Sequence, residues 1–145
     1  METNEIVMSG LQLKKLIAKK VEPIMQEYDL RPVELDLLVF LKKEKEVDTA
    51  KGIMHKKHLS KAHVSKSLEN LHIREFIRIS EDEQDHRILH ISLTEKSEEV
   101  VKKVVCVYAE CKRILQDGIP EEELAIMRRV INHMTENVNR ELGEI

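Results

Sequence analysis

Apolar residues recur every three or four positions along most of the chain, which is the spacing of amphipathic helices. This pattern predicts helices over residues 4–28, from Pro32 onward, from Thr94 to about Gln116, and from Pro120 onward. Two short stretches alternate with a period of two instead and predict strands, Phe76–Ser80 and Leu89–Leu93. The chain is therefore expected to be mainly α, with a small β element.

The segment that precedes the strands, from Thr49 to Leu71, predicts two short helices joined by a turn. Ser60 suits the N-cap of the second helix, because its hydroxyl can accept from a free N–H of the first turn. Short polar and basic residues fill the early part of that helix: Ser60, Lys61, His63, Ser65 and Lys66. Such side chains could reach base edges or phosphates in a major groove. By itself, however, this composition is more typical of a solvated surface helix.

The two strands change that balance. Ile77 and Ile79 would face inward, with Leu89, Ile91 and Leu93 on the opposing strand. The connecting loop contains no Gly or Pro, so it predicts an open wing and not a tight two-residue turn. A helix-turn-helix followed by a wing is an arrangement that reads duplex DNA.

Arg87 stands where this wing loop returns to its second strand. A cation on a protruding loop can enter a minor groove, where the negative potential is strong. Asp85 could hold the guanidinium in one orientation through a charge-assisted pair. The alternative is an exposed surface pair that contributes little.

The order of these elements resembles the MarR family (multiple antibiotic resistance regulators). The resemblance is carried by YDLRPVELDLLVFL, by LSKAHVSKSLENL, by DHR at the wing and by the LTEKSEEV that follows, and it covers nearly the whole chain. It implies a dimeric winged-helix transcription factor, usually a repressor, that binds palindromic double-stranded DNA and often releases it when a small-molecule effector binds. It also implies DNA contacts from the predicted recognition helix and wing: Ser60, Lys61, His63, Ser65, Lys66, Asp85 and Arg87.

The chain departs from the family pattern at two turns. His58 stands between the paired helices and Glu75 follows the second of them, where the family usually has glycine. Both positions often need a positive φ, which other residues reach at a cost.

Charge is distributed unevenly along the chain. The net charge is −3, yet residues 49–78 carry seven basic and two acidic residues, a balance of +5. A local concentration of positive charge is what a nucleic-acid face requires. The predicted wing tip is acidic, with Glu81, Asp82, Glu83 and Asp85. This acidity favours an alternative function, a winged-helix module for protein–protein interaction with little DNA binding.

Other chemistry has little support in the sequence. Cys106 and Cys111 are too few for a disulfide scaffold, so we expect a cytoplasmic location. Two buried structural thiols are the favoured interpretation, and a redox-sensing thiol is the alternative. His55, His58 and His63 lie close together in the sequence, but no nearby cysteine completes a zinc ligand set. We therefore expect no metal and no cofactor. The sequence contains no phosphate loop and no nucleophile elbow, so it does not predict an enzyme. It also contains no apolar run of about 18 residues, so no membrane span is predicted.

The apolar stripes of the first and last helices are wider than a domain of this length needs. In the last helix Leu124, Met127, Ile131, Met134 and Val138 alternate steps of three and four, as in a helix–helix seam. We therefore expect one MarR-type domain over residues 1–145. Within it, residues 32–93 would form the winged helix-turn-helix lobe, and residues 1–28 with 94–145 the helices that build a homodimer.

Overall fold

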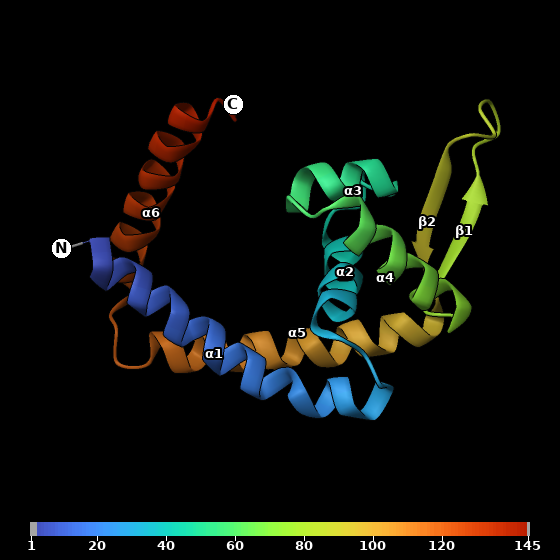
Figure 1. Cartoon of the computed structure of the whole chain (residues 1–145). Helices are drawn as coiled ribbons and strands as arrows, with labels where there is room; N and C mark the ends of the chain where they lie inside the picture. Colours follow the sequence, from blue (N-terminus) through green and yellow to red (C-terminus); the bar gives the residue numbers. More distant parts are fainter. Residues whose placement is uncertain (1–2, 145) are drawn as a thin grey trace. The chain divides into compact units, whose positions relative to one another are not determined.

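The computed structural model describes residues 3–144, and within them it contains six helices and two strands (Figure 1). In chain order these are α1 (Thr3–Tyr28), α2 (Pro32–Lys43), α3 (Ala50–Lys57), α4 (Lys61–Ile73), β1 (Ile77–Glu81), β2 (Leu89–Leu93), α5 (Glu95–Gln116) and α6 (Glu121–Leu142). The predicted fold class, mainly α with a small β-wing, is confirmed. None of the described helices is both long enough and apolar enough to cross a membrane.

The chain forms two compact units, residues 1–109 and residues 110–145. The first contains α1 to α4, both strands and most of α5. The second contains the end of α5 and α6.

In the first unit, α2 forms the centre of the core. Leu35, Leu37, Leu38, Val39 and Leu41 are all buried on this one helix. They belong to a core cluster that also includes Val21 and Ile24 of α1, Ile53 of α3, Val64, Leu68 and Leu71 of α4, and Val100, Val101 and Val104 of α5. A helix with so much buried surface is fixed, and the helix-turn-helix is built on it.

A buried carboxylate joins the start of α2 to α4. Glu34 is only 2% exposed. One of its oxygens accepts from the backbone N–H of Arg31 at 2.9 Å, and the other accepts from the Asn70 side-chain amide at 3.3 Å. The first bond satisfies the backbone N–H of Arg31, the N-cap residue of α2, and the second joins α4 to α2. A buried charge needs such partners, because an unpaired one is costly.

The helix-turn-helix has a side-chain cap at the start of each helix. The Thr49 hydroxyl accepts from Gly52 N at 3.2 Å, and the Ser60 hydroxyl accepts from His63 N at 3.3 Å. The second of these caps is the predicted one. Between the helices, His58 takes φ 51° and ψ 37°, so the left-handed turn is retained without glycine.

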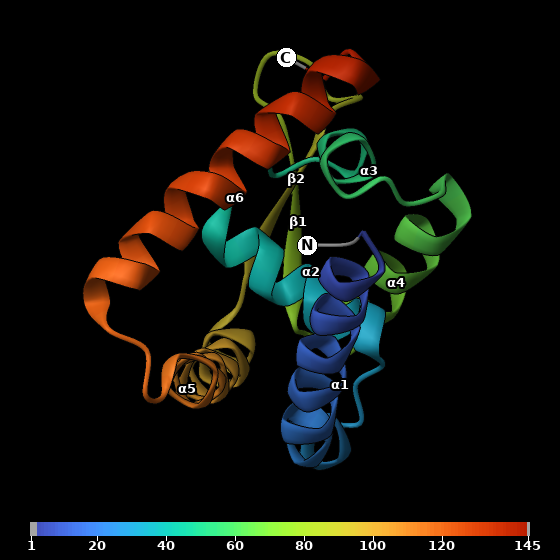
Figure 2. The same ribbon diagram turned by 90° about the vertical axis from the view of Figure 1, so that its left-hand side faces the viewer.

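The strands form an antiparallel ribbon that extends away from the helices of this unit to a loop (Figures 1 and 2). Ile77 pairs with Leu93 and Ile79 with Ile91, so the alternating apolar residues of the two strands lie on one face, as predicted. Strand β1 begins at Ile77, so the predicted start at Phe76 is wrong by one residue. Phe76 is fully buried, and the Arg74 and Lys96 cations lie 5.2 Å and 4.1 Å from its ring centre.

The other expected glycine position lies at the turn from α4 into β1. Glu75 has φ 60° there. Thr94, at the end of β2, donates its hydroxyl to the Glu75 carbonyl at 2.8 Å. The same oxygen accepts from Ser97 N at 3.4 Å and so caps α5 as predicted. One threonine therefore supports the strained turn and starts the next helix.

In the second unit, α6 leaves most of its apolar residues exposed. Leu124 is buried, whereas Met127, Ile131, Met134 and Val138 are between 40% and 56% exposed. The predicted seam thus exists as a surface stripe in the single chain.

Candidate nucleic-acid interface

The N-terminal half of α4 presents polar and basic side chains to solvent. Lys61, His63, Ser65 and Lys66 are all exposed, as is Ser60 at the cap, whereas Val64 and Leu68 are buried. The sequence-predicted site residues of this helix are therefore all accessible to solvent. The apolar stripe of Val64, Leu68 and Leu71 packs the helix on the core.

His63 has a defined orientation on this surface. Its Nδ1 lies 3.0 Å from the Ser60 hydroxyl, the same group that accepts from its backbone N–H. This contact holds the ring against the first turn of α4 through Nδ1. The Nε2 atom, on the opposite side of the ring, is then the one able to contact a base edge.

Five of the seven basic residues between 49 and 78 are exposed, and two are turned inward. Lys57 pairs with Asp36 and lies 5.5 Å from the Phe40 ring centre. Arg74 donates to the carbonyls of Asp29 and Tyr28. The sequence could not separate these structural cations from the exposed ones on α3 and α4, which are Lys51, Lys56, Lys61 and Lys66.

On the wing, the structure brings together the predicted pair. Arg87 donates through Nε and Nη2 to the two carboxylate oxygens of Asp85, each at 3.0 Å. The Arg87 backbone N–H also donates to Asp85 at 3.1 Å. Donation by Arg87 lowers the pKa of Asp85, and the same bond raises the pKa of the guanidinium. The Arg87 side chain remains 90% exposed, so the fork orients it without covering it.

The acidic wing tip is largely paired. Glu81 lies 2.9 Å from His86, and Asp82 lies 2.8 Å from His90. With Asp85 held by Arg87, three of the four wing acids have a titratable or cationic partner. Arg87 offsets the charge of Asp85, whereas His86 and His90 offset the charge of Glu81 and Asp82 only when their imidazoles are protonated.

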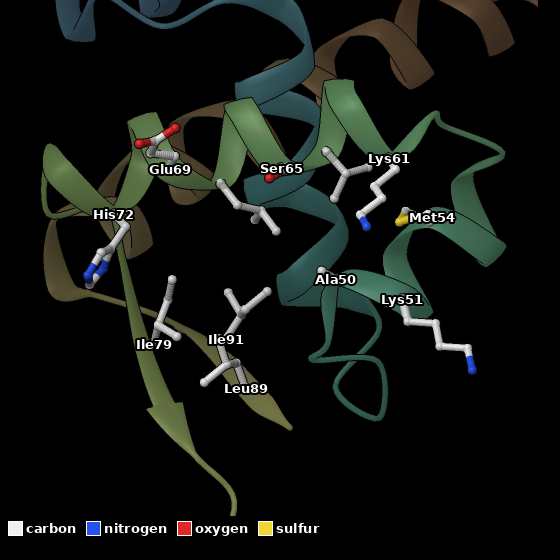
Figure 3. A pocket seen from close by; sticks show the side chains of 12 residues that line it. Ala50, Lys51, Met54, Lys61, Ser65, Glu69, His72, Ile79, Leu89 and Ile91 are labelled. Carbon is white, nitrogen blue, oxygen red and sulfur yellow. The ribbon is translucent and has the colours of Figure 1, made fainter. Parts of the chain in front are cut away.

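A pocket of about 630 Å³ lies between α3, α4 and the two strands (Figure 3). Ile79, Leu89 and Ile91 line it from the strands, while Lys61 and Ser65 line it from α4. Leu89 was expected to face inward, and it does face this pocket, although it is 47% exposed. The hollow was not predicted, because its lining comes from three segments that are separate in the sequence.

The structure also shows a cluster that sequence reasoning missed. His90 of β2 lies 2.8 Å through Nδ1 from Asp48 and 2.8 Å through Nε2 from Asp82. Asp48 precedes α3 and is 42 residues from His90, so no local spacing could have found the contact. The bond to His90 is the largest of several effects that lower the pKa of Asp82, to about 2.

The two cysteines differ in their surroundings. Cys111 is buried, as expected, whereas Cys106 is exposed, so the expectation of two buried thiols is wrong for Cys106. Their separation of five residues turns them to different faces of α5. Among the described residues, no three His, Cys, Asp or Glu side chains come together as a metal site.

A helix-turn-helix that leads directly into a two-stranded wing defines the winged-helix class. Within that class, the chain matches the family described as transcriptional regulator SarA/Rot over residues 19–104, and it belongs to this family. No curated protein matches the sequence.

Solved structures agree with the fold. The chain is similar to a MarR protein from Peptoclostridium difficile, with a TM-score of 0.78 at 18% identity, covering 97% of this chain and 91% of that one. A MarR transcriptional regulator from Methanosarcina mazei gives 0.74 at 19%, covering 95% and 99%. The MepR–DNA complex of S. aureus gives 0.73 at 20%, covering 94% and 99%. The resemblance to MarR regulators is thus confirmed for the fold.

Proposed function

We propose that this regulator binds palindromic double-stranded DNA as a homodimer, with α4 in the major groove and the wing at the flanking minor groove. One observation carries the proposal. The exposed polar residues of α4 (Lys61, His63, Ser65 and Lys66) and the Arg87 guanidinium held on the wing belong to the same compact unit. Membership of a family of transcriptional regulators supports it, as does the similarity to a MepR structure that contains DNA.

A second copy of the chain would complete this arrangement. Apolar side chains on two helices are exposed in the single chain: Ile6, Val7, Met8 and Leu11 of α1, and Ile126, Met127, Val130, Ile131, Met134, Val138 and Leu142 of α6. Exposed apolar stripes of this kind mark an interaction surface. A two-fold dimer would place its recognition helices about 34–36 Å apart, one turn of DNA, and would therefore favour a palindromic site.

Release by a small ligand would make the protein a responsive repressor. The pocket beside α4 supports this part of the proposal, because two of the exposed polar residues proposed to contact DNA, Lys61 and Ser65, also line the pocket. A ligand with an apolar body and an acidic group would bury its body against Ile79 and Ile91 and attract Lys61. Bound there, it would take Lys61 away from DNA.

Anisotropy titrations with duplex from upstream of the protein's own gene, and with random duplex, test the function. We expect tighter binding to the upstream duplex, and weakening of both as salt rises, because counterions are released on binding. Affinity that stays flat between low and physiological salt would contradict the proposal. Absence of binding would instead favour the protein–protein interaction module.

A further inference from the structure

The wing and the helix-turn-helix are connected by more than the backbone. Asp48 is the last residue before Thr49, which caps α3, and its own carbonyl accepts from Ile91 N at 2.7 Å. The Asp48 carboxylate also lies 2.8 Å from Nδ1 of His90. Asp48 is therefore held at a fixed place at the start of α3, in contact with β2 through both its backbone and its side chain.

The other nitrogen of His90 reaches the wing loop. Asp82 accepts from His90 with one carboxylate oxygen, and its other oxygen accepts from the backbone N–H groups of Gln84 and Asp85, each at 2.9 Å. Asp82 thereby shapes the turn from which the Asp85 carboxylate holds Arg87. A continuous series of hydrogen bonds runs from the start of α3 to the guanidinium.

This geometry has a requirement in protons. Carboxylates only accept, so both ring nitrogens of His90 must carry hydrogen for both contacts to form. A neutral imidazole has one N–H, so it would donate to only one carboxylate. The lone pair of its other nitrogen would then face the second carboxylate, which cannot donate to it. The simultaneous contact of His90 with both carboxylates therefore needs an imidazolium.

The surroundings of the ring favour that charge. Asp48 faces it from the segment before α3 and Asp82 from the wing loop, while Ser80, its cross-strand partner on β1, is uncharged. Arg78 lies one pair further along the same face, beside Ser92. The groove beside Asp48 and Ser92 also carries the Lys42–Glu98 ion pair of α2 and α5. The bonds to Asp82 and Asp48 raise the pKa of His90.

We propose that His90 is a positioning residue for DNA binding: as an imidazolium it ties the wing loop to the start of α3, and so fixes Arg87 relative to α4. This inference rests on the proposed function. The tie forms where both carboxylates are ionised and His90 is protonated. Because the pKa of His90 is raised, the tie is complete below the ordinary histidine range and is lost as pH rises through the raised value.

The test compares the native protein with His90→Gln and Asp48→Asn. Glutamine keeps one donor group without titrating. Asp48→Asn replaces a carboxylate, which only accepts, by an amide that can also donate, so this contact no longer requires a proton on Nδ1 of His90. The matched control is His86→Gln, because His86 also pairs with a wing acid, Glu81, but does not reach the segment before α3. Thermal melting establishes that each variant is folded.

Affinity for the upstream duplex is measured at about pH 6 and about pH 8.5 at constant salt, where histidines change charge. The native protein and His86→Gln should lose about tenfold more affinity over this range than His90→Gln, because only they lose the bridging imidazolium. Asp48→Asn should resemble His90→Gln. Histidines other than His86 and His90 are the same in all four proteins. Equal pH profiles for the native protein and His90→Gln would overturn the positioning role while leaving DNA binding intact.

Nuclear magnetic resonance of the free protein supplies a readout that does not need DNA. The His90 ring should titrate above its ordinary pKa. Protection of the Ile91 amide, taken relative to the intrinsic exchange rate at each pH, should fall as the ring deprotonates. An ordinary or lowered pKa for His90 would overturn the tie. If no duplex bound at either pH, the proposed function would fail and the positioning role with it, even with a raised pKa.

Discussion

Asp85 accepts three hydrogen bonds from Arg87, one from its backbone N–H and two from its guanidinium. The carboxylate and the arginine thus form a planar fork on the wing, and most of the arginine side chain is left in solvent. Bidentate pairs of this kind fix direction as well as distance. The wing presents a cation of known orientation, and this leads to the first prediction.

Arg87→Ala should weaken binding to the upstream duplex by about tenfold or more, because a dimer loses one oriented cation from each half-site. Folding and dimerisation should be unchanged, since the side chain is exposed. Asp85→Asn should weaken binding less, because the cation remains but loses its fork. Anisotropy measures both effects, with Lys102→Ala of α5 as the control for loss of an exposed cation. Unchanged affinity for Arg87→Ala would remove the wing from the mechanism.

Lys66 and His63 should have different roles on α4. Lys66→Ala should weaken binding to upstream and random duplex about equally and reduce the salt slope by about one for each phosphate that the lysine neutralises. His63→Ala should instead reduce the difference between the two duplexes, because its Nε2 atom is placed to read a base edge. The measurement is affinity for each duplex at several salt concentrations. A loss of sequence preference in Lys66→Ala would exchange the two roles.

The protein should sediment as a dimer at micromolar concentration. Ile131→Glu places a charge on the exposed apolar stripe of α6 and should shift the equilibrium toward monomer. Asn132→Glu adds the same charge one position away, beside the polar hollow of α6 that Asn132 lines, and serves as its control. A native protein that stays monomeric at this concentration would contradict the prediction.

Neither cysteine should be the regulatory switch. Replacing both with Ser should leave DNA binding and its release intact. Cys111→Ser should lower the free energy of unfolding by about 1–3 kcal/mol, because a hydroxyl replaces a buried thiol, whereas Cys106→Ser at the surface should not. Denaturant unfolding and DNA binding with and without peroxide check both statements. Release by peroxide from the native protein, but not from the double variant, would refute this prediction.

Glu75→Gly should stabilise the chain. Relief of the left-handed conformation gains about 1–2 kcal/mol, and the greater freedom of glycine in the unfolded chain offsets about 0.5–1 kcal/mol. We expect a net increase in the free energy of unfolding, measured by denaturant titration. Glu69→Gly, inside α4, should instead lower the free energy of unfolding by about 1 kcal/mol.

The sequence predicted the helices, the cap at Ser60 and the pairing of the strands, because each depends on residues close together in the chain. The same holds for Asp85 and Arg87, which are two positions apart. Periodicity also predicted the apolar stripe of α6, since a helical face can be read without knowing what covers it.

Long-range contacts could not be predicted in the same way. The burial of Glu34 depends on an asparagine 36 residues away, and the role of His90 on an aspartate 42 residues away. Lys57 and Arg74 look like Lys61 and Lys66 in the sequence, and only the packing of α1 and α2 separates them. The exposed Cys106 shows the same limit, because a helical pattern gives the faces of α5 without saying which of them is covered.

The backbone bond from Ile91 N to the Asp48 carbonyl also affects the outer edge of the ribbon. Strand β2 pairs with β1 along one side, and on its other side this donor is already engaged. Open strand edges recruit further strands, which leads to aggregation or to partners that dock by adding a strand. The bond blocks such recruitment at the middle of β2. Mutations that release Asp48 from β2 should therefore make the protein less soluble at high concentration.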